Sequence, residues 1–253
     1  GQAVTCDDFA QAIADANPGS ALALQLEQFK RWYSQAGTPR VQASGQYEPE
    51  SQRYTLTLRQ SCPATPGQPG KAPFVIPLEL GLLNHDGQAL ALQLEGEEAA
   101  TNTNRTVVLH EAEQQWTFVN VAQAPVPSLL RGFSAPVVLE VDYSDAELLT
   151  LLAHDQDAFN RWEAGQRLVL RRALQAITAP DDSQDASILD EALLQALRQV
   201  LHDPQLDAAF KELVLTLPSE TYIAEQLAVV NPQRIHAVRE AMRLQLALAL
   251  HAA

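Results

Sequence analysis

The chain has 253 residues, enough for one large or two ordinary domains with a sizeable core. Its 17 Lys and Arg residues against 31 Asp and Glu residues give a net charge of −14, which would repel a phosphate backbone, so we expect no nucleic-acid partner. No apolar run approaches the ~20 residues that span a bilayer and no signal-peptide pattern opens the chain, so we expect no membrane partner.

The first 36 residues are predicted to form two short helices. Asp7 is the candidate N-cap of the first helix, and Asn17-Pro18-Gly19-Ser20 ends it. The second helix ends at Gly37-Thr38-Pro39. Each helix carries one apolar stripe: Phe9, Ile13 and Ala16 in the first, and Leu22, Leu26, Phe29 and Tyr33 in the second. Two short helices cannot bury both stripes and form a core of their own, so we interpret them as a piece of a larger domain.

In residues 39–143 the apolar residues recur at every second position, the period of a β-strand. Ten of the fifteen prolines lie here, which excludes long helices. Residues 74–83 form an apolar segment that ends in Asn84-His85-Asp86-Gly87, and the Asp-Gly pair suits a tight hairpin turn. Residues 61–73 are predicted to be an irregular loop. Other segments have the apolar positions of strands: Tyr54, Leu56 and Leu58; Leu90, Leu92 and Leu94; Val107 and Leu109; Trp116 and Phe118. Seven or eight short strands at this spacing predict an antiparallel β-sandwich.

The stretch from Pro125 to Trp162 takes the chain from sheet into helix. Residues 137–143 alternate between apolar and polar faces, as a half-buried strand does, and prolines 125, 127 and 136 bracket that strand. Ser144, followed three residues later by Glu147, is a capping box that predicts a helix start.

Residues 144–253 are predicted to be helical throughout. Their prolines fall at boundaries, with Pro180 in a linker, Asp203-Pro204 and Asn231-Pro232 as N-cap and first helical residue, and Pro218 before Ser219. One stripe comprises Leu189, Leu193, Leu197, Val200 and Leu201. The last helix has one face with Ile235, Val238, Met242, Leu246 and Leu250 and a nearly opposite one with Ala241, Leu244 and Leu248. A helix that is apolar on two faces needs two neighbours, so we expect an α-solenoid-like domain of which the next helical pair is missing.

Four stretches of the sequence resemble a known family. They are Thr5 to Phe9, Phe29 to Pro39, Pro125 to Glu147, and Phe159 to Glu163. Over essentially all of its length, the chain resembles the bacterial aminopeptidase N family of zinc-dependent alanyl aminopeptidases. It resembles only the part of those enzymes that follows the catalytic motif. The resemblance implies a helical tail of a truncated catalytic domain in residues 1–38, a β-sandwich domain in residues 39–143, and the first part of a C-terminal helical domain in residues 144–253, which would help to roof the active-site cavity.

The catalytic motifs of that family are absent from the sequence. A zinc aminopeptidase needs H-E-x-x-H on a helix, whereas His110-Glu111-Ala112-Glu113-Gln114 ends in Gln and lies between two predicted strands. The family's Gly-x-Met-Glu-Asn motif is also missing, since the one methionine is Met242. We therefore predict no catalytic, cofactor-binding or metal-ligating residue on this chain. The resemblance implies that zinc and peptide substrates belong to the parent enzyme, and the expected partner is the remainder of the same polypeptide.

Other candidate residues favour structural roles. His85-Asp86, His154-Asp155 and His202-Asp203 suggest a metal phosphohydrolase, but an Asp that follows His at a helix boundary is ordinary capping chemistry. Ser128 and Ser134 have no nearby His that would activate a nucleophile. The remaining candidates are interpreted as solvated charges (Glu97-Glu98 and Asp181-Asp182), as the polar face of a helix (Arg167, Arg171 and Arg172), and as packing aromatics (Trp32, Trp116 and Trp162).

Two cysteines, Cys6 and Cys62, are too few for a disulfide-stapled secreted protein, so we expect reduced thiols and a cytoplasmic location. Two other functions stay open beside the aminopeptidase. One is a self-contained module that binds a peptide or protein with its sandwich and helices, and the other is the phosphohydrolase. An H-E-x-x-H motif upstream in the full reading frame would decide for the peptidase, and its absence would favour the binding module.

Overall fold

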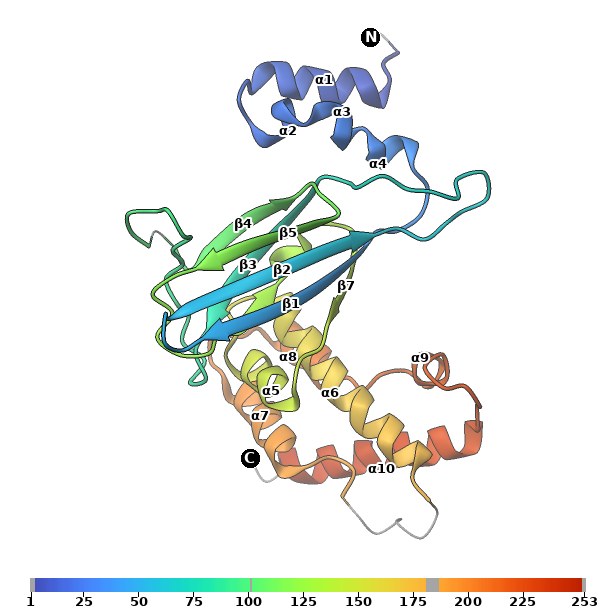
Figure 1. Cartoon of the computed structure of the whole chain (residues 1–253). Coiled ribbons are helices and arrows are strands. Elements are labelled where there is room, and N and C mark those ends of the chain that lie inside the picture. Colours follow the sequence, from blue (N-terminus) through green and yellow to red (C-terminus); the bar gives the residue numbers. More distant parts are fainter. Residues whose placement is uncertain (1–2, 101, 181–186, 252–253) are drawn as a thin grey trace. The chain divides into compact units, whose positions relative to one another are not determined.

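The computed structural model describes residues 3–100, 102–180 and 187–251. The chain divides into two compact units (Figure 1). The first, the sandwich unit, comprises the residues up to Asn84 together with Ala89–Asp142. The second, the helical unit, comprises His85–Gln88 and the residues from Tyr143 onward. A β-sandwich followed by helices confirms the predicted fold class, whereas the division at residues 38/39 and 143/144 stays a prediction.

The sandwich unit begins with four short helices, α1 (Cys6–Ala16), α2 (Ala21–Leu24), α3 (Leu26–Phe29) and α4 (Arg31–Ser34). The N-cap of α1 is Thr5 rather than Asp7, because the Thr5 hydroxyl accepts from the Asp8 amide and the Asp8 carboxylate accepts from the Thr5 amide. The predicted second helix is broken at Gln25, whose backbone is not helical, and the chain turns again at Lys30. On either side of Lys30, the side chain of Gln28 donates to the Pro73 carbonyl and the indole of Trp32 donates to the Val75 carbonyl.

Seven strands follow in the described residues: β1 (Arg40–Glu48), β2 (Arg53–Ser61), β3 (Ile76–Leu83), β4 (Asn104–Leu109), β5 (Glu113–Phe118), β6 (Val126–Leu129) and β7 (Val138–Val141). They form one sheet in the order β5-β2-β1-β7 and a second in the order β4-β3-β6. The alternation of β2 is as predicted, with Tyr54, Leu56 and Leu58 buried and their neighbours partly exposed. Leucines and aromatic side chains from both sheets make one apolar core.

The sandwich differs from the prediction in two places. The β1–β7 pair is parallel rather than antiparallel, because the chain returns from the second sheet through the 3₁₀ helix η1 (Arg131–Phe133) and enters beside β1 in the same direction. Residues 89–94 make isolated bridges instead of a return strand. Prolines 125, 127 and 136 lie outside β7, as predicted. Pro127 lies inside β6, an edge strand, where a missing amide hydrogen is tolerated.

The helical unit contains α5 (Asp145–His154), α6 (Ala158–Thr178), α7 (Glu191–His202), α8 (Ala208–Leu215), α9 (Glu220–Ala224) and α10 (Pro232–His251). The capping box of α5 is confirmed, since Ser144 and Glu147 each accept from the backbone amide of the other. The prediction that Asp203 caps a helix starting at Pro204 is wrong. Asp203 ends α7, and Asp207 caps α8 by accepting from the Phe210 amide.

The two apolar faces of α10 have different surroundings. Ile235, Val238, Met242 and Leu246 are buried, while Leu244 and Leu248 are 61% and 66% exposed. The prediction of a second, uncovered apolar face is therefore confirmed for these two leucines. Within the part of the chain that the structure describes, no helix is both long enough and apolar enough to cross a membrane.

Candidate functional sites

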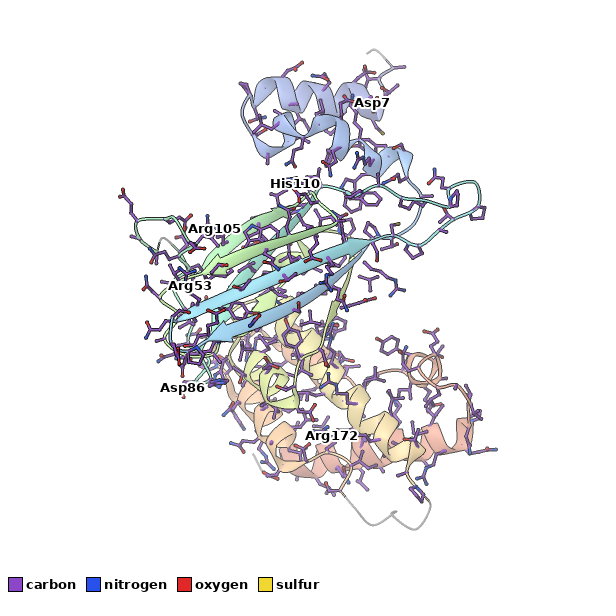
Figure 2. The ribbon with its side chains drawn as sticks, viewed as in Figure 1. Asp7, Arg53, Asp86, Arg105, His110 and Arg172 are labelled. Atoms are coloured by element: carbon purple, nitrogen blue, oxygen red, sulfur yellow. The ribbon has the colours of Figure 1, made fainter. Side chains whose placement is uncertain are left out.

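The nearest match to a zinc motif, His110 to Gln114, comprises the turn of residues 110–112 between β4 and β5 and the first two residues of β5 (His110 is labelled in Figure 2). The side-chain oxygen of Gln114 accepts from the amides of His110 and Glu111 at 2.6 and 3.0 Å. The zinc motif requires its second His at position 114, and here that position holds a Gln that stabilises the turn. The predicted placement between two strands holds for residues 110–112, whereas Glu113 and Gln114 already belong to β5. This backbone does not present two ligands on one helical face.

The three His-Asp pairs occupy a turn and two helix ends, as predicted. His85 and Asp86 lie in the turn after β3, and Asp155 and Asp203 are the C-caps of α5 and α7. Asp155 is almost fully buried and accepts from the Asp157 amide at 3.0 Å. No group of three or more His, Cys, Asp or Glu side chains that could hold a metal ion occurs in residues 3–100, 102–180 and 187–251. The described residues therefore do not fit a zinc centre.

Arg161 joins the ends of two of these helices and was not singled out from the sequence. Its guanidinium donates to the carbonyl oxygens of Leu152 and Ala153, at the end of α5, and to the Asp203 carboxylate beyond α7. The side chain is only 8% exposed. The sequence did contain an indication that Arg161 is buried, because position 161 shares a helical face with Ala164, Gly165 and Leu168, which are all buried.

Arg167 pairs with Glu163 on its own helix, as expected of a polar face, whereas Arg171 and Arg172 do more. Arg171 donates to the Asp145 carboxylate and to the Tyr143 carbonyl at 2.8 Å each. Arg172 binds Asp145 at 2.7 Å and Asp190, the N-cap of α7, at 2.6 Å. Hydrogen bonds from Arg171 and then Arg172 lower the pKa of the Asp145 carboxyl. The carboxylate of Asp145 is therefore a charged partner of two arginines, and it is unsuited to act as a general acid near neutral pH.

The candidate nucleophiles Ser128 and Ser134 have structural partners. Ser128 is fully buried and accepts from the Nε of Arg131 at 2.7 Å, and the Ser134 hydroxyl accepts from the Glu79 amide at 2.9 Å. Arg131 is itself 3% exposed and also donates to the side chain of Asn104. The sequence did not reveal this buried arginine, because its partner Asn104 lies in β4, 27 residues earlier in the chain.

Two of the remaining interpretations can be compared with the structure. The Glu97 side chain is 32% exposed, and it is also paired, because Arg105 (labelled in Figure 2) donates two hydrogen bonds of 2.9 and 2.6 Å to its carboxylate. The hydrogen bonds from Arg105 are the main reason why the pKa of the Glu97 carboxyl is lowered. Trp32 and Trp116 pack against the sandwich core, as predicted. Asp181 and Asp182 lie outside the described residues.

A hollow of about 410 Å³ in the helical unit lies between α6 and α10. Alanines 176, 179, 237 and 241 form much of its wall, together with Arg172 and Arg234. Arg172 is held by two aspartates, and Arg234 donates to the carbonyl oxygen of Ala176 at 2.9 Å. Both arginines are therefore committed to contacts within the fold.

Two family models match the chain, one for each part of the fold. A domain of unknown function with an Ig-like fold, DUF3458, matches residues 37–142. A second, DUF3458_C, described as ARM repeats, matches residues 145–253.

Three relatives found by sequence share one name. Aminopeptidase N of Escherichia coli K12 is 40% identical over 250 residues, and that of Haemophilus influenzae Rd is 37% identical over 250 residues. Aminopeptidase N of Caulobacter vibrioides is 37% identical over 251 residues. Each alignment covers 99% of this chain, but the chain spans only 27–28% of the length of these relatives.

A solved structure has a similar fold. It is the crystal structure of Legionella pneumophila aminopeptidase A in complex with aspartic acid, which matches with a TM-score of 0.76 and 24% identity. The match covers 99% of this chain and 26% of that one.

Proposed function

Because this chain belongs to the aminopeptidase N family, we propose that it is a non-catalytic portion of a zinc-dependent enzyme that removes N-terminal residues from peptides. The observation that carries the proposal is the alignment of 99% of the chain with about a quarter of each relative. The sequence contains neither H-E-x-x-H nor Gly-x-Met-Glu-Asn. The residues that bind zinc and grip the substrate amine would thus lie in other parts of the polypeptide.

In this proposal the sandwich is a structural linker and the helices form part of a roof over the active-site cavity. The uncovered leucines of α10 support a further helical neighbour, because a helix with two apolar faces is stable between two layers. The proposed partner is accordingly the remainder of the same polypeptide. We also propose a cytoplasmic location, which is supported by the free thiols of Cys6 and Cys62.

The chain alone is expected not to hydrolyse a chromogenic alanyl substrate. Its described residues offer no zinc-bound water to attack the peptide bond, since no three ligand side chains converge. The measurement is the rate of chromophore release by chain purified from a host that lacks its own alanyl aminopeptidase, compared with a chelator-treated sample. Chelator-sensitive turnover that elutes together with the chain would contradict the proposal.

The chain is also expected to retain much less than one zinc ion per molecule after dialysis. Elemental analysis of the dialysed protein measures this directly, with His110→Ala and His154→Ala variants as comparisons. One tightly held zinc per chain, lost in either variant, would show that a His outside the family motif binds metal. It would favour the phosphohydrolase interpretation over the present one.

A further inference from the structure

The sandwich unit contains two separate apolar cores. Leucines and aromatic residues of both sheets make the larger one, and the small one consists of Ala10, Ala14 and Leu26 with Leu22, Ala23 and Phe29 around them. The small core holds α1, α2 and α3 together. It does not join them to the sheets, so another set of contacts must set the orientation of these helices on the sandwich.

Side chains of α3 and α4 make the first half of these contacts, and their hydrogen bonds all go to backbone carbonyl groups of the sandwich unit. Gln28 donates to the carbonyl oxygens of Pro73 and His110, and Arg31 donates to that of Pro73 at 2.5 Å. The indole of Trp32 donates to Val75 at 2.9 Å, and its ring lies 4.8 Å from the ring of Phe74, centre to centre.

The loop of residues 61–73 makes the other half. Its residue Gln68 accepts from the Ala36 amide at 2.8 Å and donates to the Ser34 carbonyl at 2.9 Å. Ala72 donates its amide to Gln35, which donates back to the Ala72 carbonyl. The ammonium of Lys71 has three oxygen partners, on Ala36, Thr65 and Gln68, at 2.6–2.7 Å. This loop, predicted to be irregular, is thus tied to the segment that follows α4.

We propose that these contacts form a latch that makes the joint between α1–α3 and the sandwich rigid rather than a hinge. The latch comprises Gln28, Arg31, Trp32 and Gln35 on the helices and Gln68 and Lys71 on the loop. Hydrogen bonds to backbone groups fix direction as well as distance, and several from two sides leave little freedom of rotation. The significance of the latch rests on the proposed linker role, in which α1–α3 and the sandwich move as one body, but its test does not depend on peptidase activity.

The test compares a double variant, Gln68→Ala with Lys71→Met, with a matched control, Gln11→Ala with Lys211→Met. The Gln11 side chain donates to Asp15 within its own helix, away from the latch. One spin label is placed on Cys6, which is exposed on α1, and a second on the thiol introduced by Ser44→Cys on the exposed face of β1, both in a Cys62→Ser background. Pulsed electron resonance then gives the distribution of distances between α1 and the sheet.

We expect one narrow distance distribution in the unaltered latch and in the control, and a clearly broader one in the latch variant. Amide exchange at Ala36 should accelerate by about tenfold, the change expected for one lost hydrogen bond of typical strength. Exchange at Leu56 in β2 should be unchanged, which shows that the sandwich is still folded.

A broad distribution with the latch intact would show a hinge and overturn the proposal. A narrow one in the double variant calls for a third variant that also carries Gln28→Ala and Arg31→Met, which removes donors of the helical half of the latch. A distribution that stays narrow in that variant would show that contacts outside the latch hold the joint, and it too overturns the proposal. Acceleration at Leu56 together with Ala36 would mean that the loop holds the sandwich itself, and this also contradicts it. The measurements of peptidase activity and of zinc content, by contrast, test only the proposed function.

Discussion

Replacing Arg161 with methionine is expected to destabilise the helical unit by about 2–4 kcal/mol, because it removes a buried cation that several groups share. Methionine keeps most of the apolar stem of the side chain but cannot donate to Leu152, Ala153 or Asp203. The carbonyl groups at the end of α5 would lose their donors, and their partial negative charge, which the end of a helix accumulates, would be left uncompensated. Asp203 would keep a charge with one partner fewer.

Urea unfolding followed by circular dichroism at 222 nm measures the loss, since helices dominate that signal. The matched control is Arg243→Met, in which an arginine that is 68% exposed loses its ion pair with Glu240 on the same helix. Exposed pairs of this kind contribute about 0–1 kcal/mol, so the control should unfold close to the parent midpoint. Equal midpoints for the two variants would show that Arg161 is dispensable.

Replacing Gly81 with alanine is expected to destabilise the sandwich unit by about 2–4 kcal/mol, although it adds only one methyl group. A Cβ at this position of β3 would overlap the guanidinium of Arg131. That group cannot move aside easily, because Ser128 and Asn104 hold it in the protein interior. The variant must therefore either shift the strand or break the hydrogen bonds of a buried cation, and both are costly.

Gly70→Ala is the control for this change, because a Cβ there meets no atom within 4 Å and the backbone does not need positive φ. It should be neutral, or slightly stabilising by about 0.4–1 kcal/mol through the unfolded chain. The fluorescence of Trp116 and Trp32, which both pack against the sandwich core, follows unfolding in urea. If Gly81→Ala unfolded at the same urea concentration as Gly70→Ala, the guanidinium of Arg131 would be able to shift without a measurable cost.

Several elements could be predicted from the sequence because their causes are local. The alternation of Tyr54, Leu56 and Leu58 identified β2, since side chains of a strand point to opposite faces in turn. Ser144 and Glu147 located the start of α5, since both capping bonds close within three residues. The same reasoning misplaced the start of α8 because two aspartates, Asp203 and Asp207, each suit an N-cap, and local pattern alone does not choose between them.

The sequence by itself determined the order of sheet and helix, the absence of the family's catalytic motifs, and the second apolar face of α10, because these depend on periodicity and residue type. Only the tertiary structure decided which distant partners the polar and charged side chains find. Arg131 reaches Asn104 across 27 residues, Arg161 reaches Asp203 across 42, and Gln28 reaches His110 across 82. A charge in a sequence indicates that a partner or water is needed, whereas the partner is chosen by which segments the folded core brings together.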